Sequence, residues 1–377
     1  MQPMTTRFST DGALGAGDIA ERLATRRNYQ QEVRRLVASY PVVVFYGCGL
    51  MLSSIIETWD EYVGRQVDFC CDSDPDKWGK SFAGIPCVSP DQLLAMRDRC
   101  VVFLTVGQFK PVYDFLTRNG VASVNIIYKY DLLSSEFLAT HEDREIAEDL
   151  AAARALMADE RSRMVFDAIL ERMLAGEHDP GLMSSVCEPD QYFPADIVQL
   201  TDHESFVDIG AFDGDTARDF ADRTGGQFAR ITCFEIDRIN FEALRETVGQ
   251  MPCADRITIH NLGIWDSECD ITYSIDRFQS TVGDGEGKGH VVALDDVLGN
   301  SPVSYIKMDI EGAEPRALIG ARRIIQAQKP RLAICAYHHI RHLWEIPLAI
   351  HELVPEYRIY LRHHTNLEYE TVCYAVC

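Results

Sequence analysis

The stretch from Phe206 to Thr216 carries the residues with the clearest chemical role. Its letters, FVDIGAFDGDT, are typical of a buried strand, a sharp Gly-rich turn and the first turn of a helix, which predicts the ligand-binding corner of a Rossmann-like sheet. Three acids, Asp208, Asp213 and Asp215, would repel a pyrophosphate but suit the ammonium and sulfonium groups of S-adenosylmethionine (SAM). The glycines are spaced G-x-x-x-G rather than G-x-G-x-x-G, which favours SAM over NAD. An ordinary turn with solvated acids is the alternative.

Another acid ends the next predicted strand. Glu235 closes the run from Ile231 to Glu235, 25 residues beyond Gly210. A carboxylate at this position has lone pairs for both ribose hydroxyls of an adenosine. SAM and NAD share this contact, so Glu235 indicates a nucleoside without choosing between them. A surface acid at a strand end is the alternative.

Lys307, Asp309 and Glu311 alternate at the end of a strand predicted over 304–309. Alternation places them on one face, where burial without a function would be costly. The carboxyl end of a sheet strand is also where ligands bind. Methyl transfer requires alignment of donor and acceptor and removal of a proton from the acceptor hydroxyl, and these residues have the chemistry for both. An ion-pair cluster without catalytic function is the alternative.

Histidines gather near the C-terminus. They follow two predicted strands, which should bring them to the same sheet edge as Asp309, and they are His338, His339, His342, His363 and His364. Histidine is the usual general base near neutral pH. With Asp309 or Glu311 a histidine could instead hold a divalent metal ion. For each histidine taken singly, a structural role is an equal alternative.

The elements around these residues alternate between strand and helix. From residue 189 on, we predict strands beginning at 206 and over 231–235, 257–263, 304–309, 331–337, 357–361 and 371–376, with helices over 240–248, 315–328 and 340–354. This alternation indicates a mostly parallel sheet. The last two strands are too close for a crossover helix, so they should pair antiparallel. Short strands over 270–274 and 290–294 flank a Gly-rich loop, 283–289, which is a flexible loop or a lid.

A smaller Rossmann-like unit precedes this region. A helix over 18–40 should pack on it, and strands are predicted over 42–46, 67–71, 101–106 and 124–128. Gly47 and Gly49 open a G-x-G motif and Asp72 ends the next strand, as ribose recognition requires. Leu52 occupies the third glycine position, so the fingerprint is incomplete. The unit either binds a nucleotide or nucleotide sugar, or it has a structural or substrate-presenting role.

Residues 142–176 are rich in Ala, Glu, Arg and Met, with apolar positions at helical spacing. They predict one or two amphipathic helices that connect the two units or mediate a homodimer, and Pro180 should end them. The chain therefore divides into 1–133, the N-terminal Rossmann-like domain, 134–188, a helical connector, and 189–377, the second α/β domain.

Composition limits the partners. The 377 residues carry 36 Lys and Arg against 58 Asp and Glu, a net charge of −22, which argues against nucleic acid and anionic membrane surfaces. We expect no membrane span and no secretion signal in residues 1–17. The 12 Cys show no zinc spacing, so we expect no metal, with the cysteines as small buried hydrophobes in a reducing cytoplasm.

Several separate motifs carry a resemblance to a known family. FVDIGAFDGDT, CFEIDRINFEAL, YIKMDIEGAEPRALIGA, RLAICAYHH and YLRHHTNLEYETVCYAV, in this order, resemble the FkbM family of SAM-dependent methyltransferases over residues 189–377. The resemblance implies a class I methyltransferase fold with an antiparallel C-terminal hairpin, SAM as the cofactor, and O-methylation of a sugar, glycan or natural-product hydroxyl. The segment DSDPDKWGKSFAGIPCVSP also resembles the small domain that precedes some FkbM proteins.

The resemblance also implies a set of site residues. Those expected in the cofactor pocket are Asp208, Gly210, Ala211, Phe212, Asp213, Gly214, Asp215, Thr216, Glu235 and Ile236. Those expected to face the acceptor are Lys307, Asp309, Glu311 and His338. Together with the residue chemistry, this predicts a cytoplasmic SAM-dependent O-methyltransferase acting on a carbohydrate-type hydroxyl. The rivals are a nicotinamide-dependent sugar-nucleotide-modifying enzyme that uses the N-terminal unit, and a non-catalytic SAM- or nucleotide-binding protein.

Overall fold

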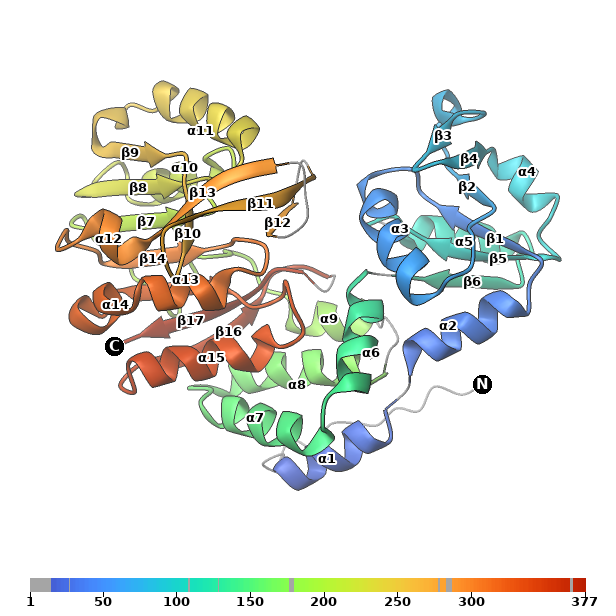
Figure 1. Ribbon diagram of the computed structural model, residues 1–377, viewed down its shortest axis with the longest axis horizontal. Helices are drawn as coiled ribbons and strands as arrows, with labels where there is room; N and C mark the ends of the chain where they lie inside the picture. Colours follow the sequence, from blue (N-terminus) through green and yellow to red (C-terminus); the bar gives the residue numbers. More distant parts are fainter. Residues whose placement is uncertain are drawn as a thin grey trace.

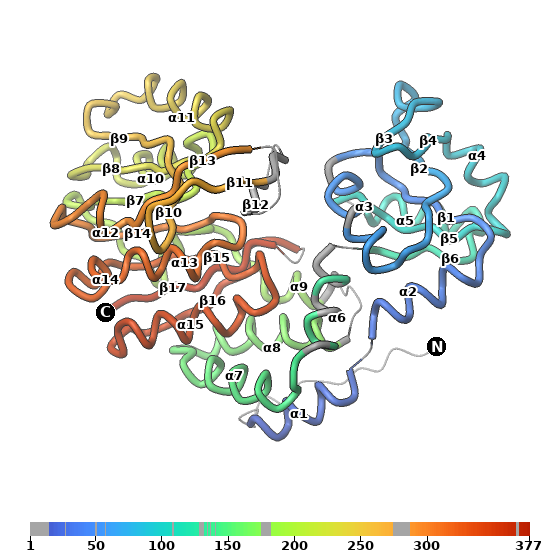
Figure 2. The backbone as a smooth tube through the Cα atoms, in the orientation of Figure 1, coloured from blue at the N-terminus to red at the C-terminus, as the bar shows by residue number. Residues whose placement is uncertain are grey.

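A computed structural model describes residues 15–26, 28–107, 109–127, 129–175, 180–276, 279–282, 287–366 and 369–377. Two α/β units, one blue to cyan and the other yellow-green to red, are joined by a group of helices (Figures 1 and 2). Each unit has its own sheet, and a third, smaller sheet lies in the C-terminal unit. The predicted mixed α/β class is confirmed.

The first sheet has six strands in the order β3-β4-β2-β1-β5-β6. All its neighbours pair parallel except β3 and β4. Its strands are β1 (Val42–Tyr46), β2 (Phe69–Cys71), β3 (Ser81–Phe82), β4 (Ile85–Val88), β5 (Cys100–Leu104) and β6 (Ser123–Ile126). The four predicted strands are confirmed. β3 and β4 were not predicted, because runs this short carry no readable alternation.

Helices cover both faces of the first sheet. They are α3 (Leu50–Tyr62), α4 (Pro90–Leu94) and α5 (Phe109–Arg118), with a 3₁₀ turn at Pro75–Lys77. On the α3 face, Trp59 makes edge contacts with Phe45 and Phe103, with ring centroids 4.9 and 5.1 Å apart. On the other face, Leu93 of α4 and Leu116 of α5 are fully buried. The strands are therefore buried on both sides, as their continuous apolar runs require.

The single helix predicted over 18–40 is wrong. Two helices occupy this stretch, α1 (Ala16–Ala24) and α2 (Tyr29–Ala38). The break comes from Asn28, whose side chain accepts a hydrogen bond from the backbone N of Gln31 and so caps a new helix. Only α2 joins the core of the first unit. α1 packs on the connector helix α7, with Ile19 and Leu23 fully buried.

Four helices form the connector. They are α6 (Lys129–Thr140), α7 (Asp143–Ala155), α8 (Glu160–Ala175) and α9 (Pro180–Val186). Pro180 begins α9 rather than ending a helix, since the first helical position needs no backbone N–H. The apolar stripe predicted from Ile146 to Met157 is buried against the C-terminal unit, where α7 packs on α15 and α8 on β16. A homodimer through the connector stays a prediction, without an exposed stripe to support it.

The C-terminal unit is built on seven strands in the order β16-β17-β15-β14-β7-β8-β9. They are β7 (Ser205–Ile209), β8 (Arg230–Phe234), β9 (Ile257–His260), β14 (Tyr305–Met308), β15 (Arg331–Cys335), β16 (Arg358–His363) and β17 (Thr371–Val376). β17 runs antiparallel to both of its neighbours, and the other pairs are parallel. The predicted parallel sheet with a C-terminal antiparallel hairpin is confirmed.

Helices cover both faces of this sheet as well. α10 (Asp215–Arg223) and α11 (Arg238–Gln250) pack on one face. On the other lie α13 (Glu314–Gly320), α14 (Arg322–Gln328) and α15 (His342–Leu353), together with α7 and α8. The short helix α12 (Leu294–Leu298) and a 3₁₀ turn at Ala254–Arg256 complete the unit. The helix predicted over 315–328 is thus two helices that meet at Ala321.

A small sheet stands beside the carboxyl edge of the large one. It comprises β10 (Gly263–Trp265), β11 (Cys269–Asp276), β12 (Gln279–Val282) and β13 (Gly287–Ala293), in the order β10-β13-β11-β12. The strand predicted over 257–263 is therefore two strands, β9 and β10, in different sheets. Of the predicted loop or lid over 283–289, residues 283–286 lie outside the described residues, and the rest belongs to β13.

Two composition-based expectations have structural outcomes. The four cysteines expected inside strands, Cys70, Cys233, Cys335 and Cys373, are buried, whereas Cys269 and Cys377 are exposed. Among the described helices, none combines the length and apolar character needed to cross a bilayer.

Phe166 tests whether the connector belongs to the core of the C-terminal unit. Phe166 is fully buried in α8, within the same core as β15 and α15. Phe166→Ala should lower the free energy of unfolding of the C-terminal unit by about 3–5 kcal/mol, measured by urea denaturation. Met164→Ala, on the exposed side of the same helix, is the control and should change it by less than about 0.5 kcal/mol. Equal free energies of unfolding for Phe166→Ala and the wild type would show that the connector is not part of this core.

Candidate active site

Gly210 sets the shape of the turn after β7. It has φ +77°, and a Cβ atom there would lie 1.8 Å from the carbonyl oxygen of Asp309. Only glycine permits this approach between the turn and the end of β14. Two larger residues beside it, Phe212 and Glu311, have φ of +48° and +56°. Such backbone costs about 1–3 kcal/mol per residue and concentrates at ligand sites.

Asp208 and Lys307 form a buried ion pair behind this turn. They are register partners on the adjacent strands β7 and β14, and Lys307 Nζ lies 3.1 Å from Asp208 Oδ1. The same ammonium donates to the carbonyl of Gly210 at 2.6 Å. Burial lowers the pKa of Lys307, but the carboxylates of Asp208 and Asp309 more than offset this and leave the pKa raised. Burial also raises the pKa of Asp208, to about 6, so both groups are charged at pH 7.

Glu235 lies in the loop after β8, and both of its carboxylate oxygens accept hydrogen bonds from backbone N–H groups. Oε2 accepts from the backbone N of Phe212 at 2.9 Å, and Oε1 accepts from that of Asp237 at 2.8 Å. Each oxygen keeps a lone pair for another donor. Burial raises the pKa of Glu235 to about 7. A buried carboxylate with spare acceptor capacity, facing a cavity, is the group predicted for two ribose hydroxyls.

The cavity beside Glu235 has a volume of about 300 Å³ and lies between the carboxyl edge of the large sheet and the small sheet. Its walls near Glu235 are mostly apolar and come from both sheets: Phe234, Ile236, Leu262, Ile264, Ile271 and Val291. Asn240, Tyr273 and Trp265 add polar and aromatic groups. This combination of apolar walls and few polar groups suits a flat heteroaromatic base beside a ribose.

The other end of the cavity carries acids and phenols. Asp309 accepts from the hydroxyl of Tyr192 at 2.8 Å and from that of Tyr337 at 3.3 Å. Glu311 and Glu370 line the same end, and Glu370 accepts from the side-chain amide of Gln191. Burial and the neighbouring Asp309 charge raise the pKa of Glu370 to about 7. Hydroxyl donors and a carboxyl group that titrates near neutral pH are therefore close together here.

His338 lies behind this acidic end. Its Nδ1 contacts Glu314 Oε1 at 2.8 Å, and its Nε2 lies 3.3 Å from both Asp309 Oδ1 and Glu311 Oε2. Burial lowers the pKa of His338, but the carboxylates of Glu314 and Glu311 outweigh it and raise the pKa well above the usual range. The imidazole is therefore protonated at neutral pH, and its positive charge holds the carboxylates in place.

A metal ion could also be held in this cluster. One potential ligand atom from each of Asp309, Glu314 and His338 lies within 4.8 Å of the others. An imidazole must be unprotonated to bind a metal ion. Here protonated His338 already supplies the positive charge among the carboxylates. A divalent ion would have to displace that proton, so an ion-pair network and a metal centre are the two alternatives for this group.

The predicted site residues divide into those at the cavity and those behind it. Lining the cavity are Gly210, Phe212, Asp215, Thr216, Glu235, Ile236, Lys307, Asp309 and Glu311. The other five predicted residues do not line the cavity, and their roles at a ligand stay predictions: Asp208, Ala211, Asp213, Gly214 and His338. Asp208 does not line the cavity because its side chain pairs with the buried Lys307. Only Asp215 of the three acids in the turn faces the cavity, so the repulsion argument against a pyrophosphate is weaker than expected.

Sequence reasoning missed Tyr192 and Glu370. Tyr192 comes from the segment before β7, and Tyr305 donates to its carbonyl oxygen, which anchors it over the sheet. Glu370 precedes β17, and because β17 is antiparallel to β15, its start lies at the carboxyl edge of the parallel strands. An acid just before the last strand was the available signal. Of the remaining histidines, His342 also lies beside the Glu314 carboxylate, with Nδ1 3.5 Å from Oε2. The other three have different partners: His339 packs on Phe137, His363 pairs with Thr371, and His364 pairs with Tyr374.

In the N-terminal unit, Asp72 has other partners. Its Oδ2 accepts from the backbone N of Cys48 at 2.9 Å and from Lys77 Nζ at 2.8 Å. These contacts brace the turn after β1 and use much of the capacity expected for a ribose. A nucleotide ligand for this unit stays a prediction.

Comparison with known proteins finds one family model that matches part of the C-terminal unit. Residues 208–367 match the family model described as methyltransferase FkbM domain. Over 97% of this chain and 100% of the other, the structure superimposes on methyltransferase FkbM from Methylobacillus flagellatus KT, with a TM-score of 0.75 and 24% identity. This likeness shows a common fold. No curated protein matches the sequence.

More distant solved structures resemble only part of the chain. A putative rRNA-methylase from Clostridium thermocellum covers 46% of this chain and 87% of its own, with 14% identity and a TM-score of 0.31. A precorrin-6y C5,15-methyltransferase from Geobacter metallireducens GS-15 covers 47% and 82%, with 11% identity and a TM-score of 0.31. Nothing about this chain follows from scores this low.

The buried ion pair should dominate the local stability. Lys307→Met leaves the Asp208 carboxylate buried without its partner and should lower the free energy of unfolding by about 3–5 kcal/mol. The double variant Asp208→Asn with Lys307→Met removes both charges and should recover most of that loss. Urea denaturation measures both. A double variant that is no more stable than Lys307→Met would show that the cost comes from packing rather than charge.

Glu235 should make stability depend on pH. Its pKa is about 7 in the folded protein against 4.5 as the ordinary value, so ionisation disfavours the folded state as pH rises between these values. Relative to Glu235→Gln, the wild type should lose about 2–3 kcal/mol of stability from pH 5 to pH 8. The hydrogen bond lost in the variant adds an offset that does not change with pH. Parallel stability profiles for the two proteins would contradict the raised pKa.

Proposed function

We propose that this chain methylates a hydroxyl of a sugar, glycan or similar polyol. The premise is that residues 208–367 form the methyltransferase FkbM domain of a SAM-dependent methyltransferase. The observation that carries the proposal is one cavity with two chemically different ends. One end has apolar walls and the buried Glu235, and the other has acids and phenols around Asp309. A donor and a hydroxyl acceptor would thus share one enclosed space.

The end beside Glu235 fits the cofactor that the family uses. Glu235 keeps acceptor lone pairs for two ribose hydroxyls, and Ile236 and Ile264 supply apolar walls for an adenine. Asp215 and Asp309 carry negative charge toward the interior of the cavity, which suits an ammonium and a sulfonium. SAM supplies an electrophilic methyl group when bound. The protein has then to orient the acceptor oxygen toward it and accept a proton.

The acidic end fits an acceptor rich in hydroxyl groups. Asp309 and Glu311 offer lone pairs to hydroxyl donors, and Tyr192 and Tyr337 offer flat aromatic rings for an apolar sugar face. Glu370 is the best candidate for the general base, because its pKa of about 7 lets it take a proton near neutral pH. This choice replaces His338, which is already protonated.

Lys307 and His338 would act as positioning residues. Lys307 draws the Gly210 carbonyl and Asp208 together, which holds the turn between the two ends of the cavity. His338 keeps Asp309 and Glu311 together despite their like charges. This cation offsets part of the cost of the two charges, although burial and the neighbouring Asp309 still leave the pKa of Glu311 raised.

Two rival functions would give different results in a binding screen. A nicotinamide-dependent enzyme that uses the N-terminal unit would be stabilised thermally by NAD and not by SAM. A non-catalytic SAM-binding protein would be stabilised by SAM but would methylate no acceptor. The cytoplasmic location belongs to the proposal only as an expectation.

SAM affinity should depend on the charge of Glu235. Ribose hydroxyls donate to the ionised carboxylate, so with a pKa of about 7 affinity should rise about tenfold between pH 6 and pH 8. Glu235→Gln should bind SAM weakly at every pH. Glu246→Gln, at an exposed position of α11, is the matched control and should keep the wild-type profile. Isothermal titration calorimetry gives all three profiles, and wild-type affinity in Glu235→Gln would contradict the assignment.

Glu370 should matter for turnover rather than for the donor. Glu370→Gln should lower kcat for methylation by about 10²-fold or more and leave the affinity for SAM unchanged. The assay uses purified protein, SAM and a panel of sugars and polyols, with mass spectrometry to find acceptors that gain one CH₂. Glu246→Gln is again the control. Methylation of amines alone across a mixed panel would refute the hydroxyl acceptor, and an unchanged kcat would remove Glu370 as the base.

A further inference from the structure

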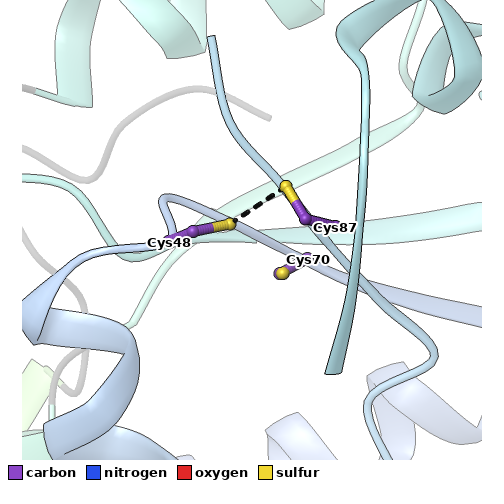
Figure 3. A group of neighbouring side chains, drawn as sticks. All are labelled: Cys48, Cys70 and Cys87. Atoms are coloured by element: carbon purple, nitrogen blue, oxygen red, sulfur yellow. Dashed lines mark hydrogen bonds between the residues drawn. The ribbon is translucent and has the colours of Figure 1, made fainter. Parts of the chain in front are cut away.

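Three cysteines meet in the N-terminal unit although they are far apart in the sequence. Cys48 follows β1 in the turn that leads to α3, Cys70 lies in β2, and Cys87 lies in β4. Their sulfur atoms all lie within 4.8 Å of one another, and Cys48 Sγ is 3.5 Å from Cys87 Sγ. Figure 3 shows the three sulfurs at the corners of a triangle. The cluster lies outside the methyltransferase FkbM domain and plays no part in the function proposed above.

The strand register produces this arrangement. Cys70 and Cys87 are direct partners on the parallel strands β2 and β4, so their side chains project side by side from one face. Cys48 comes from the far side of β2, and its backbone N is fixed by the Asp72 carboxylate at 2.9 Å. Gly47, with φ +119°, passes the carbonyl of Thr105 where a Cβ would lie 2.5 Å away. The turn that presents Cys48 is therefore held on two sides.

The surroundings decide what this cluster can do. The exposed fractions of Cys48, Cys70 and Cys87 are 5%, 0% and 3%, and the group shares a core with Phe45 and Trp59. Apolar packing alone explains one buried cysteine. It does not explain three thiols brought together from three segments, since a thiol is a weak hydrogen-bonding group. Converging sulfur ligands are what a soft metal ion requires.

We propose that Cys48, Cys70 and Cys87 bind one Zn²⁺ ion through their sulfurs. Zinc–sulfur bonds of about 2.3 Å in a tetrahedral site place the sulfurs about 3.8 Å apart. Cys48 Sγ and Cys87 Sγ are 3.5 Å apart, and no two of the three sulfurs are more than 4.8 Å apart, so shifts of about 1 Å or less would bring the sulfurs to this distance.

Charge favours Zn²⁺ over Cu(I) at this site. Three thiolates with Zn²⁺ carry a net charge of −1, whereas three thiolates with Cu(I) carry −2. In a buried apolar environment the smaller net charge costs less. Starting from three thiols, binding of Zn²⁺ releases three protons to the solvent and changes no oxidation state.

The site would have an open coordination position. Among the described residues, the group contains three ligand side chains and no fourth. Zinc sites with three protein ligands keep a position for water or another ligand. Cys48 follows β1, and Cys87 is the next-to-last residue of β4, so the cluster sits toward the carboxyl edge of the sheet, where open α/β sheets bind their ligands. The proposal therefore gives the N-terminal unit a metal with an exchangeable ligand.

The test uses the full chain, purified under a non-chelating reductant. Mass spectrometry of the native protein and elemental analysis should find about one Zn²⁺ per chain. After removal with a chelator, Co²⁺ added as a spectroscopic probe should give the intense sulfur-to-cobalt charge-transfer absorption of thiolate ligation. Calorimetry of Zn²⁺ binding in two buffers of different ionisation enthalpy counts the released protons.

Adjacent cysteines on one strand provide a matched pair of variants. Cys70 and Cys71 are both fully buried in β2, but they belong to the cores on opposite faces of the sheet. Cys70→Ala should weaken Zn²⁺ binding by more than about 100-fold, beyond the loss caused by changes outside the ligand set. Cys71→Ala should leave it unchanged. Circular dichroism and urea denaturation show whether each variant is folded.

A second measurement needs no variant. In the wild-type chain under native conditions, bound Zn²⁺ should slow alkylation of Cys48, Cys70 and Cys87 and leave the rate at Cys100, another buried cysteine, unchanged. Absence of Zn²⁺ together with absence of the cobalt charge-transfer band would overturn the proposal. So would equal affinity in wild type and Cys70→Ala, preferential retention of copper, or equal protection at Cys100.

Discussion

The ion pair between Asp208 and Lys307 is the interaction on which the active site depends. It joins the two central strands of the large sheet, β7 and β14, at the point where both end. Lys307 also binds the Gly210 carbonyl, and Gly210 in turn touches the end of β14 so closely that no side chain fits. A charge pair in a low-dielectric interior is sensitive to the loss of either member. The turn that separates the two ends of the cavity is therefore tied to the centre of the sheet.

Several acidic side chains lie close to this pair. Asp309, Glu311 and Glu314 surround one imidazolium, that of His338. Glu370 and Glu235 are left without such a cation in direct contact, and burial raises the pKa of both to about 7. The protein thus contains carboxylates of two kinds: the pKa values of Asp309 and Glu314 are lowered beside this cation, whereas burial raises those of Glu311, Glu235 and Glu370. The second kind is the one that can take up a proton during a reaction.

The helices between the two units have an architectural role. Arg362, fully buried in β16, donates to Asp159 before α8 at 2.7 Å and to Asp196 at 2.6 Å. Arg362 and the apolar side chains of α7 and α8 together cover the part of the large sheet that the β16–β17 hairpin forms. α1 reaches back to the same surface. The N-terminal unit is thereby attached through elements that belong to the core of the other unit.

The sequence by itself determined the fold class, the positions of most strands along the chain and the edge of the sheet at which the cavity lies. Those follow from local signals: apolar runs, a Gly-rich turn and the spacing that forbids a crossover before β17. It also identified Glu235 and the end of β14. Only the tertiary structure decided which acids face the cavity, because Asp208 and Asp309 differ by a pairing between strands about 100 residues apart. Likewise Glu370, Tyr192 and the three cysteines converge through strand direction and register, which are properties of the assembled sheets and leave no mark on local spacing.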